Sequence, residues 1–299
     1  MNTLDLPALA DRLRQHVLTL ARAPRAPGSA EHRQAAAYVR GHLERAGFGV
    51  RESAVREGGF AGVNLLTDPL PARGGLPLVI VGAHYDTIPD TPGADDNASA
   101  IAALLELAAW LGPQLRAAGT LHARVQLAAY DLEEYGLLGS TVHSRAVERT
   151  QTPLRGMIAL EMLGYTDKRP GSQGLPPHLA GAYPDVANFI GVCGNESSRG
   201  LLQIVTAALK GVPGLPVEFL AVPGAGEVLP ETRLSDHSSF WDRGLPALMI
   251  TDTSFFRNPH YHQPTDTPET LDYPFLARVT TGLCAAVWQL VADVPASPR

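Results

Sequence analysis

The chain has only two cysteines, Cys193 and Cys284, in 299 residues. Two thiols this far apart exclude a disulfide framework and a zinc site built mainly from cysteines. Both fall in apolar runs, so we expect buried thiols. Lysine is equally scarce, because Lys168 and Lys210 are the only two, and the formal net charge is -6. A nucleic-acid partner would need a basic face, so this acidic balance argues against one.

Long hydrophobic runs are also missing. No apolar run approaches the ~18 residues of a membrane span. The N-terminal sequence breaks its apolar positions with acids and arginines, unlike a signal peptide. We therefore expect a cytoplasmic protein without a membrane partner. Hydrophobic residues make up 45% and charged residues 18% of the chain, which is typical of a soluble globular protein. We predict a single domain over residues 1–299.

The most informative stretch runs from residue 79 to residue 96 and reads VIVGAHYDTIPDTPGADD. An apolar run over 76–83 predicts a buried strand that ends abruptly in polar groups. Residues 99–111 are rich in good helix formers and nearly free of charge, which predicts a buried helix. His84 lies at the strand end and Asp96 lies close to the helix start. Ligand sites in open α/β sheets lie outside the carboxyl ends of the strands, so this is the first candidate site.

Further strands and helices alternate along the chain. The expected helices cover residues 4–23, 30–46, 140–149, 198–210 and 273–291. The expected strands cover residues 48–54, 123–130, 156–160, 189–192, 217–222 and 247–251, with another beginning at 64–66. This alternation predicts a three-layer α/β domain. Two long segments rich in proline and glycine, 164–188 and 223–235, are expected to be loops that wall the site.

Acids and histidines follow four of these strands. Besides His84 and Asp96 they are Glu133, Glu134, Glu161 and His262. Counting one of the adjacent glutamates leaves five nitrogen and oxygen ligands, which suit Zn²⁺. A single catalytic zinc needs only about three protein ligands, so the set predicts two metals that share a carboxylate. Neighbours on an extended segment point in different directions, so one glutamate can bind metal while the other faces water.

Six short blocks in order give the sequence a likeness to a known family. They read HYD, GADDNAS, EEYGLLGS, ALEMLGY, SDH and YHQPTDT, and together they span residues 84–267. With these blocks the chain resembles the M28 family of di-zinc aminopeptidases. The resemblance implies a zinc-dependent exopeptidase-like fold, with a mixed, mostly parallel β-sheet between helices and the site at the carboxyl ends of the strands. It also implies two zinc ions per chain and a peptide substrate with a free N-terminus.

The resemblance implies a ligand role for five residues. His84 would bind one zinc and Asp96 would bridge both. Glu134 and His262 would bind the second zinc. Glu161 stands where the best-known members have an aspartate ligand, and other members carry glutamate there. The longer side chain makes Glu161 a ligand whose geometry the sequence leaves open.

The resemblance also implies the catalytic residues. Glu133 would take the proton of a water molecule, and hydroxide would attack the peptide carbonyl. Asp86 would orient the histidine of the HYD block through a hydrogen bond to its other ring nitrogen. Tyr261, next to the last ligand, is the candidate donor to the oxyanion. Some members instead use a tyrosine a few residues before the SDH block, where this chain has Thr232 and Arg233.

Several alternatives stay open at this point. Asp95 could bridge the metals in place of its neighbour, and His260 could replace the histidine two residues later, although the blocks favour residues 96 and 262. Glu161 could be a surface acid, and His237 fits a packed or substrate-lining histidine better than a ligand.

Two other functions compete with the aminopeptidase. They are a glutaminyl cyclase with one zinc on the same scaffold and a metal-free binding protein. Carboxylate-rich sites also accept Mn²⁺ or Co²⁺. The sequence indicates neither the preferred N-terminal residue nor the oligomeric state.

Overall fold

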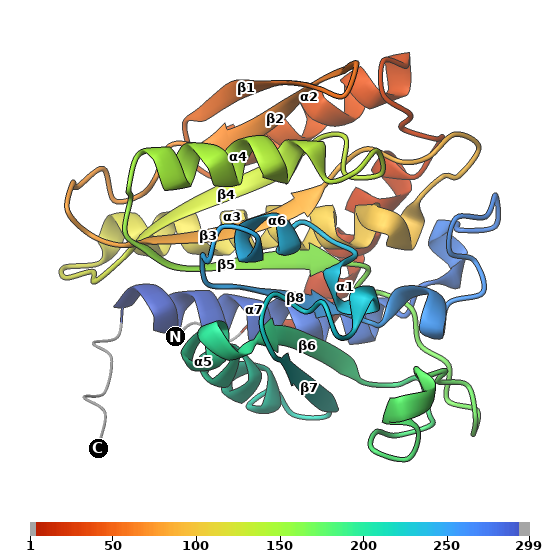
Figure 1. Ribbon diagram of the computed structural model, residues 1–299. Coiled ribbons are helices and arrows are strands. Elements are labelled where there is room, and N and C mark those ends of the chain that lie inside the picture. The colour runs from red at the N-terminus through yellow and green to blue at the C-terminus, as the bar shows by residue number, and fades with distance from the viewer. Residues whose placement is uncertain (1–3, 293–299) are drawn as a thin grey trace, which may run out of the picture.

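The computed structural model describes residues 4–292, apart from the side chain of His178, and centres on one eight-stranded β-sheet (Figure 1). In chain order the strands are β1 (Val50–Glu57), β2 (Phe60–Thr67), β3 (Leu78–His84), β4 (Arg124–Tyr130), β5 (Leu154–Glu161), β6 (Ile190–Asn195), β7 (Val217–Val222) and β8 (Ala247–Thr251). They lie side by side in the order β1-β2-β4-β3-β5-β8-β6-β7. The four central strands β4, β3, β5 and β8 run parallel, whereas β1–β2, β2–β4 and β6–β8 pair antiparallel. The predicted mixed sheet is confirmed.

Helices cover both faces of this sheet. They are α1 (Leu6–Leu20), α2 (Ala30–Arg45), α3 (Ala100–Ala117), α4 (Leu138–Arg149), α5 (Arg199–Lys210), α6 (Ser238–Trp241) and α7 (Tyr273–Ala292). Alternate residues of a strand face opposite sides. In β3, Val79 and Val81 pack into the core formed with α1, α2, α3, α5 and α7, whereas Leu78 and Ile80 pack toward α4 and α6. Figure 1 shows α4 and α6 in front of the sheet, with α3 and α7 behind it. The predicted three-layer architecture is confirmed.

Every helix and strand expected from the sequence is present, with bounds that differ by a few residues. Side chains cap the first turns of α2 and α7. Ser29 accepts a hydrogen bond from the backbone N–H of His32 at 3.0 Å, and Asp272 accepts one from Phe275 at 2.9 Å. The helix α6 lies outside the predictions, because four residues are too few for a periodic pattern.

Within residues 4–292, two helices are long and apolar enough to cross a membrane by length and composition alone, Ala94–Ala117 and Tyr273–Ala292. The sequence contains no uninterrupted apolar run of this length, whereas these windows qualify by mean hydropathy. Within the structure 78% and 67% of the two windows are buried. Core helices of soluble proteins have the same length and composition, so this finding is weak support for a membrane span.

Candidate metal centre

The candidate ligands come from strands that are neighbours in the sheet. His84 is the last residue of β3 and Glu161 is the last residue of β5, and the two strands pair in parallel. Glu133 and Glu134 follow β4, and the loop with His262 follows β8. Because parallel strands end at the same edge of the sheet, these side chains meet at one place although up to 178 positions, from 84 to 262, separate them.

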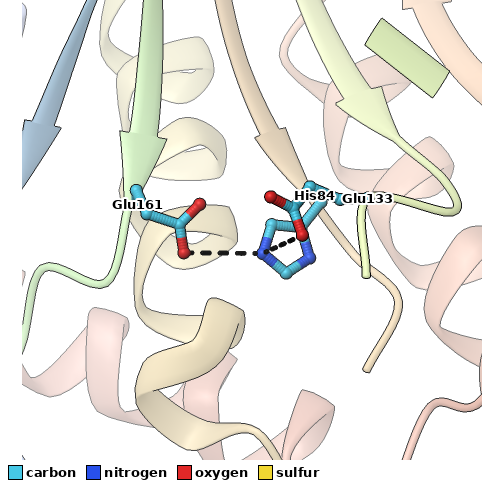
Figure 2. Close-up of side chains that lie close together, drawn as sticks. All are labelled: His84, Glu133 and Glu161. Atoms are coloured by element: carbon cyan, nitrogen blue, oxygen red, sulfur yellow. Dashed lines mark ion pairs between the residues drawn. The ribbon is translucent and has the colours of Figure 1, made fainter. Parts of the chain in front are cut away.

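One group of ligand atoms comes from His84, Glu133 and Glu161, and these atoms lie within 4.8 Å of one another. In Figure 2 two dashed lines, one from each carboxylate, meet at the same ring nitrogen of His84. The Nε2 atom of His84 lies 3.6 Å from Oε1 of Glu161 and 3.9 Å from Oε2 of Glu133. The hydroxyl of Ser235 donates to Oε2 of Glu161 at 2.7 Å, which leaves the other oxygen turned toward the imidazole. Glu161 is therefore no surface acid, because it is 7% exposed.

A second group comes from Asp96, Glu134 and His262, again within 4.8 Å. Nε2 of His262 lies 3.1 Å from Oε2 of Glu134 and 3.2 Å from Oδ2 of Asp96. The other carboxylate oxygen of Asp96, Oδ1, lies 3.3 Å from Nε2 of His84. Asp96 thus stands between the two groups with one oxygen toward each. It does so because the turn before α3 is kinked, with Asp96 itself in a non-helical conformation at φ -101° and ψ 88°.

The ring nitrogens of the two histidines indicate that these groups fit divalent cations. The Nε2 atoms of His84 and His262 are buried, and neither makes a hydrogen bond of acceptable geometry within the described part of the chain. Both nonetheless have carboxylate oxygens around them at 3.1–3.6 Å. Buried polar atoms are normally paired, so nitrogens that aim at no acceptor indicate a missing partner. Imidazole nitrogen and carboxylate oxygen are the ligands that Zn²⁺ takes.

The pKa shifts of the site residues also favour bound cations. Burial raises the pKa of Glu134 to about 7, and the charge of Asp96 adds to the rise. Burial likewise raises the pKa of Glu133. Burial alone would lower the pKa of His262, but Asp96 and Glu134 outweigh it and raise that pKa to about 10. Carboxylates crowded into a buried site repel one another, and bound divalent cations would relieve that repulsion.

Asp86 differs in detail from the sequence prediction. Nδ1 of His84 lies 3.2 Å from the backbone carbonyl of Asp86 but 3.6 Å from its carboxylate, which is beyond hydrogen-bond distance. The carboxylate instead accepts from the backbone N–H groups of Glu133 at 3.2 Å and Glu134 at 3.4 Å. The carbonyl thus faces the imidazole while the side chain reaches the loop after β4. Asp86 therefore contacts both segments.

Asp95 and Asp266 shape the turn that carries Asp96. Asp95 accepts from the backbone N–H of Gly164 at 2.9 Å and from Asn258 Nδ2 at 2.8 Å, and it belongs to neither ligand group. Asp266 accepts from the backbone N–H groups of Asp95 and Asp96 at 3.0 and 3.1 Å. Asp266 stands in the YHQPTDT block, but its role could not be predicted, because a linear pattern does not show which N–H groups a loop carboxylate meets.

The two other candidate histidines lie outside both ligand groups. His260 is half-buried, and its Nδ1 lies 2.9 Å from the hydroxyl of Thr265. His237 is buried, and its Nε2 donates to the backbone carbonyl of Thr232 at 2.7 Å. Its ring packs edge-on against Trp241 at 4.4 Å, as expected for a packed histidine.

A cavity opens beside the two groups. Its lining includes the site residues Asp96, Glu133, Glu134, Glu161 and Tyr261. The segment 164–188 contributes Gln173, Leu175, Pro176, Leu179 and Tyr183, and the segment 223–235 contributes Leu229, Glu231, Thr232 and Leu234. Both long loops therefore lie at the walls of the cavity. Cys193 lines it as a free, buried thiol, and Cys284 is free and buried as predicted.

The chain matches a known family over most of its length. The sequence model of Peptidase family M28 matches residues 71–287, which include all the ligand and catalytic candidates. The chain belongs to peptidase family M28. The predicted family is confirmed, and this is the family to which the six sequence blocks pointed.

Relatives of this M28 chain include enzymes of known class. The uncharacterized protein YfbL of Escherichia coli is 42% identical over 75% of this chain and 70% of its own length. A probable zinc metalloprotease of Pyrenophora tritici-repentis is 27% identical over 74% of this chain, and leucine aminopeptidase 1 of Ajellomyces dermatitidis is 30% identical over 69%. The chain spans about half the length of these two, 50% and 51%. The predicted enzyme class, a zinc-dependent peptidase, is supported by these relatives.

Solved structures share the fold of this M28 chain. BSAP, a zinc aminopeptidase from Bacillus subtilis, superposes with a TM-score of 0.74 at 15% identity and covers 97% of both chains. A glutaminyl cyclase from Porphyromonas gingivalis superposes with a TM-score of 0.70 at 19% identity, covering 93% of this chain and 97% of the cyclase. At such low identity the likeness shows the fold, and two kinds of enzyme share it.

Proposed function

We propose that this chain is a di-zinc aminopeptidase that hydrolyses the N-terminal peptide bond of peptides. The observation that carries the proposal is the position of Asp96, whose two oxygens face the two ligand groups. His84 and Glu161 would complete the ligand set of one zinc, and Glu134 and His262 that of the other. When bound, two zinc ions lower the pKa of water and act as Lewis acids on the substrate carbonyl.

Glu133 is the general base in this proposal. Its side chain lines the cavity together with Glu161 and lies 3.9 Å from Nε2 of His84. Burial raises its pKa, so the carboxylate takes up a proton more readily than an exposed glutamate does. It would accept the proton of the attacking water and return it to the departing amine. Asp86 supports this role, because its carboxylate holds the backbone of Glu133.

Tyr261 is the proposed donor to the oxyanion. It lines the cavity, and its ring stacks on His262 with 3.8 Å between centroids. Thr232 lines the same cavity near the position where some members carry a tyrosine. The Thr232 hydroxyl, however, donates to the carbonyl of Leu229 at 2.7 Å, so its proton is already engaged.

We expect Tyr261→Phe to lower kcat by about 100-fold with unchanged zinc content, because the ring stays while the oxyanion loses a donor. Steady-state hydrolysis of an aminoacyl p-nitroanilide and metal analysis measure both quantities. Thr232→Val is the matched control and should leave kcat nearly unchanged. A normal kcat in Tyr261→Phe, or an equal loss in both variants, would contradict the assignment.

The cavity walls predict which N-terminal residues are rejected. Glu218 and Glu231 add two carboxylates to a largely apolar wall, and no described lining residue is Arg, Lys or His. Oε2 of Glu231 is buried and has no hydrogen-bond partner within the described residues. An acidic N-terminal side chain would therefore enter a cavity whose described side chains offer it negative charge and no positive charge.

We expect kcat/KM for a glutamyl amide to be at least about 10-fold below that for a leucyl amide. Glu231→Gln should reduce this difference in kcat/KM between the two substrates, since it removes one of the repelling charges. The control is Glu227→Gln in the same loop, because Glu227 accepts from the backbone of Ala225 and does not line the cavity. Equal kcat/KM values for both substrates in the wild type would contradict this expectation.

Metal content and hydrolysis, measured together on gently purified protein, test the proposed function. About two zinc ions per chain, with aminoacyl amide hydrolysis lost on chelation, would support it. One tightly held zinc without hydrolysis would favour the glutaminyl cyclase, whose fold this chain shares. No metal at all would favour a binding protein on the same scaffold.

We further propose that residues 1–299 act as one peptidase domain, which is supported by the single sheet that runs through the described residues. A cytoplasmic location with no nucleic-acid or membrane partner is also proposed, on the basis of the sequence composition alone.

A further inference from the structure

A buried arginine lies behind the candidate metal centre, in the short segment between α1 and α2. Arg25 is 1% exposed. Its guanidinium donates to backbone carbonyls, Nε to Tyr85 at 2.9 Å, Nη1 to Pro92 at 2.7 Å and to Leu20 at 3.0 Å, and Nη2 to Gly93 at 3.0 Å. One side chain therefore joins the end of α1 to two separate places in the chain.

Both of these places carry a proposed zinc ligand. Tyr85 directly follows His84, and Gly93 comes three residues before Asp96. The segment between them, 85–93, has no helix or strand of its own. Its path therefore depends on hydrogen bonds with other segments of the chain. The guanidinium plane of Arg25 joins the two ends of this loop.

The backbone of Arg25 strengthens the attachment. Its N–H donates to the hydroxyl of Thr87 at 2.8 Å, and the N–H of Thr87 donates back to its carbonyl at 3.3 Å. The approach to Gly93 is close, because a Cβ at that position would lie 2.9 Å from Nη2 and 2.2 Å from the carbonyl oxygen of Asp96. The loop is therefore fitted tightly around the guanidinium.

Burial of a charged guanidinium at this position costs free energy of folding. A buried charge loses its hydration, and Arg25 has no carboxylate among its hydrogen-bond partners. The negative charges of Asp266, Asp96 and Asp86 favour the protonated guanidinium. A lysine has the same charge but not the planar set of donors that reaches several carbonyls at once. The position requires the shape of arginine as well as its charge.

We propose that Arg25 is a positioning residue of the metal centre, which holds loop 85–93 so that His84 and Asp96 point at the same zinc ion. The inference rests on the proposed zinc site. It assigns Arg25 no contact with substrate. Partners that orient metal ligands in this way typically change metal affinity or activity by about 10- to 100-fold when removed.

The test compares Arg25→Met and Arg25→Lys with the wild type and with Leu209→Ala. Leu209 is buried on α5 against Gly282 of α7 and lies outside both the ligand groups and loop 85–93. Leu209→Ala should therefore lower the stability of the protein, as the Arg25 variants do, without a change near the metal centre. The readouts are the zinc dissociation constants, from competition with a chromophoric chelator, and the Tm of the metal-free proteins.

We expect Arg25→Met to bind zinc about 10- to 100-fold more weakly and Arg25→Lys to lie between it and the wild type. Leu209→Ala should lose Tm but keep its zinc affinity. If Arg25→Met does not fold, Arg25→Lys gives the same comparison. Wild-type zinc affinity in Arg25→Lys and Arg25→Met, or in Arg25→Lys alone if the other does not fold, would overturn this inference and leave the proposed function intact. A wild type that binds no zinc would overturn both.

Discussion

Glu133→Gln is expected to lower kcat for aminoacyl amide hydrolysis by about 10³-fold or more while the protein keeps its zinc. The amide has nearly the shape of the carboxylate but cannot accept a proton from water. Glu133 shares a group with His84 and Glu161 and also lines the cavity, where water and substrate meet. Single-turnover hydrolysis and zinc analysis on the same sample measure the effect.

Glu134→Gln is the matched comparison. The two glutamates are adjacent, and both backbones are held by the carboxylate of Asp86, so the substitutions perturb the loop alike. Glu134 lies 3.1 Å from Nε2 of His262, in the second group, so its substitution should lower zinc content as well as activity. If Glu133→Gln hydrolysed peptides at the wild-type rate, or if it lost zinc as Glu134→Gln does, Glu133 would not be the base.

The second large effect is expected for His262→Ala. Removing this imidazole takes away the only nitrogen ligand of its group, so the chain should bind about one zinc fewer and lose kcat by about 10³-fold. Asp96 and Glu134 would remain but with no neutral ligand between their charges. Isothermal titration with zinc gives the stoichiometry, and steady-state kinetics give the rate.

His260→Ala is the control for this variant, two residues away in the same loop. His260 is half-buried and interacts with Thr265, and it belongs to neither ligand group. Its substitution should leave zinc stoichiometry unchanged and kcat close to that of the wild type. A loss of zinc in His260→Ala with none in His262→Ala would reverse the two assignments.

These variants also separate the proposed aminopeptidase from a cyclase on the same fold. In a single-zinc enzyme, one of the two ligand groups would be dispensable for metal binding. His84→Ala removes the nitrogen ligand of one group and His262→Ala that of the other. Two zinc ions require that each substitution cost one ion, whereas one zinc predicts that only one substitution matters.

The sequence alone determined the local structure and the kinds of residues at the site. Hydrophobic periodicity depends on the chain itself, so the strands β3, β4, β5 and β8 could be predicted, and with them the polar residues at their ends. The six blocks then implied which family the chain resembles, since several short matches in a set order rarely occur together by chance. The family and the mixed sheet are both confirmed.

The roles of single side chains within a loop depended on the tertiary structure. Asp86 illustrates this, because the resemblance implied that its carboxylate accepts a hydrogen bond from the ring of His84. The backbone carbonyl makes that contact instead, and the carboxylate accepts from the loop after β4. The direction of a side chain after a strand end depends on the turn that follows, and a turn is shaped by the segments that pack on it.

The contacts of Arg25 and Asp266 could not be predicted from the sequence for the same reason. Each contacts residues of the Asp96 turn from a distant part of the chain, Arg25 from before α2 and Asp266 from after β8. Backbone carbonyls and N–H groups are present at every position, so no pattern of residue types marks the ones that a side chain will meet. The ligands were determined by residue type and order, but their support was decided only when the fold brought separate segments together.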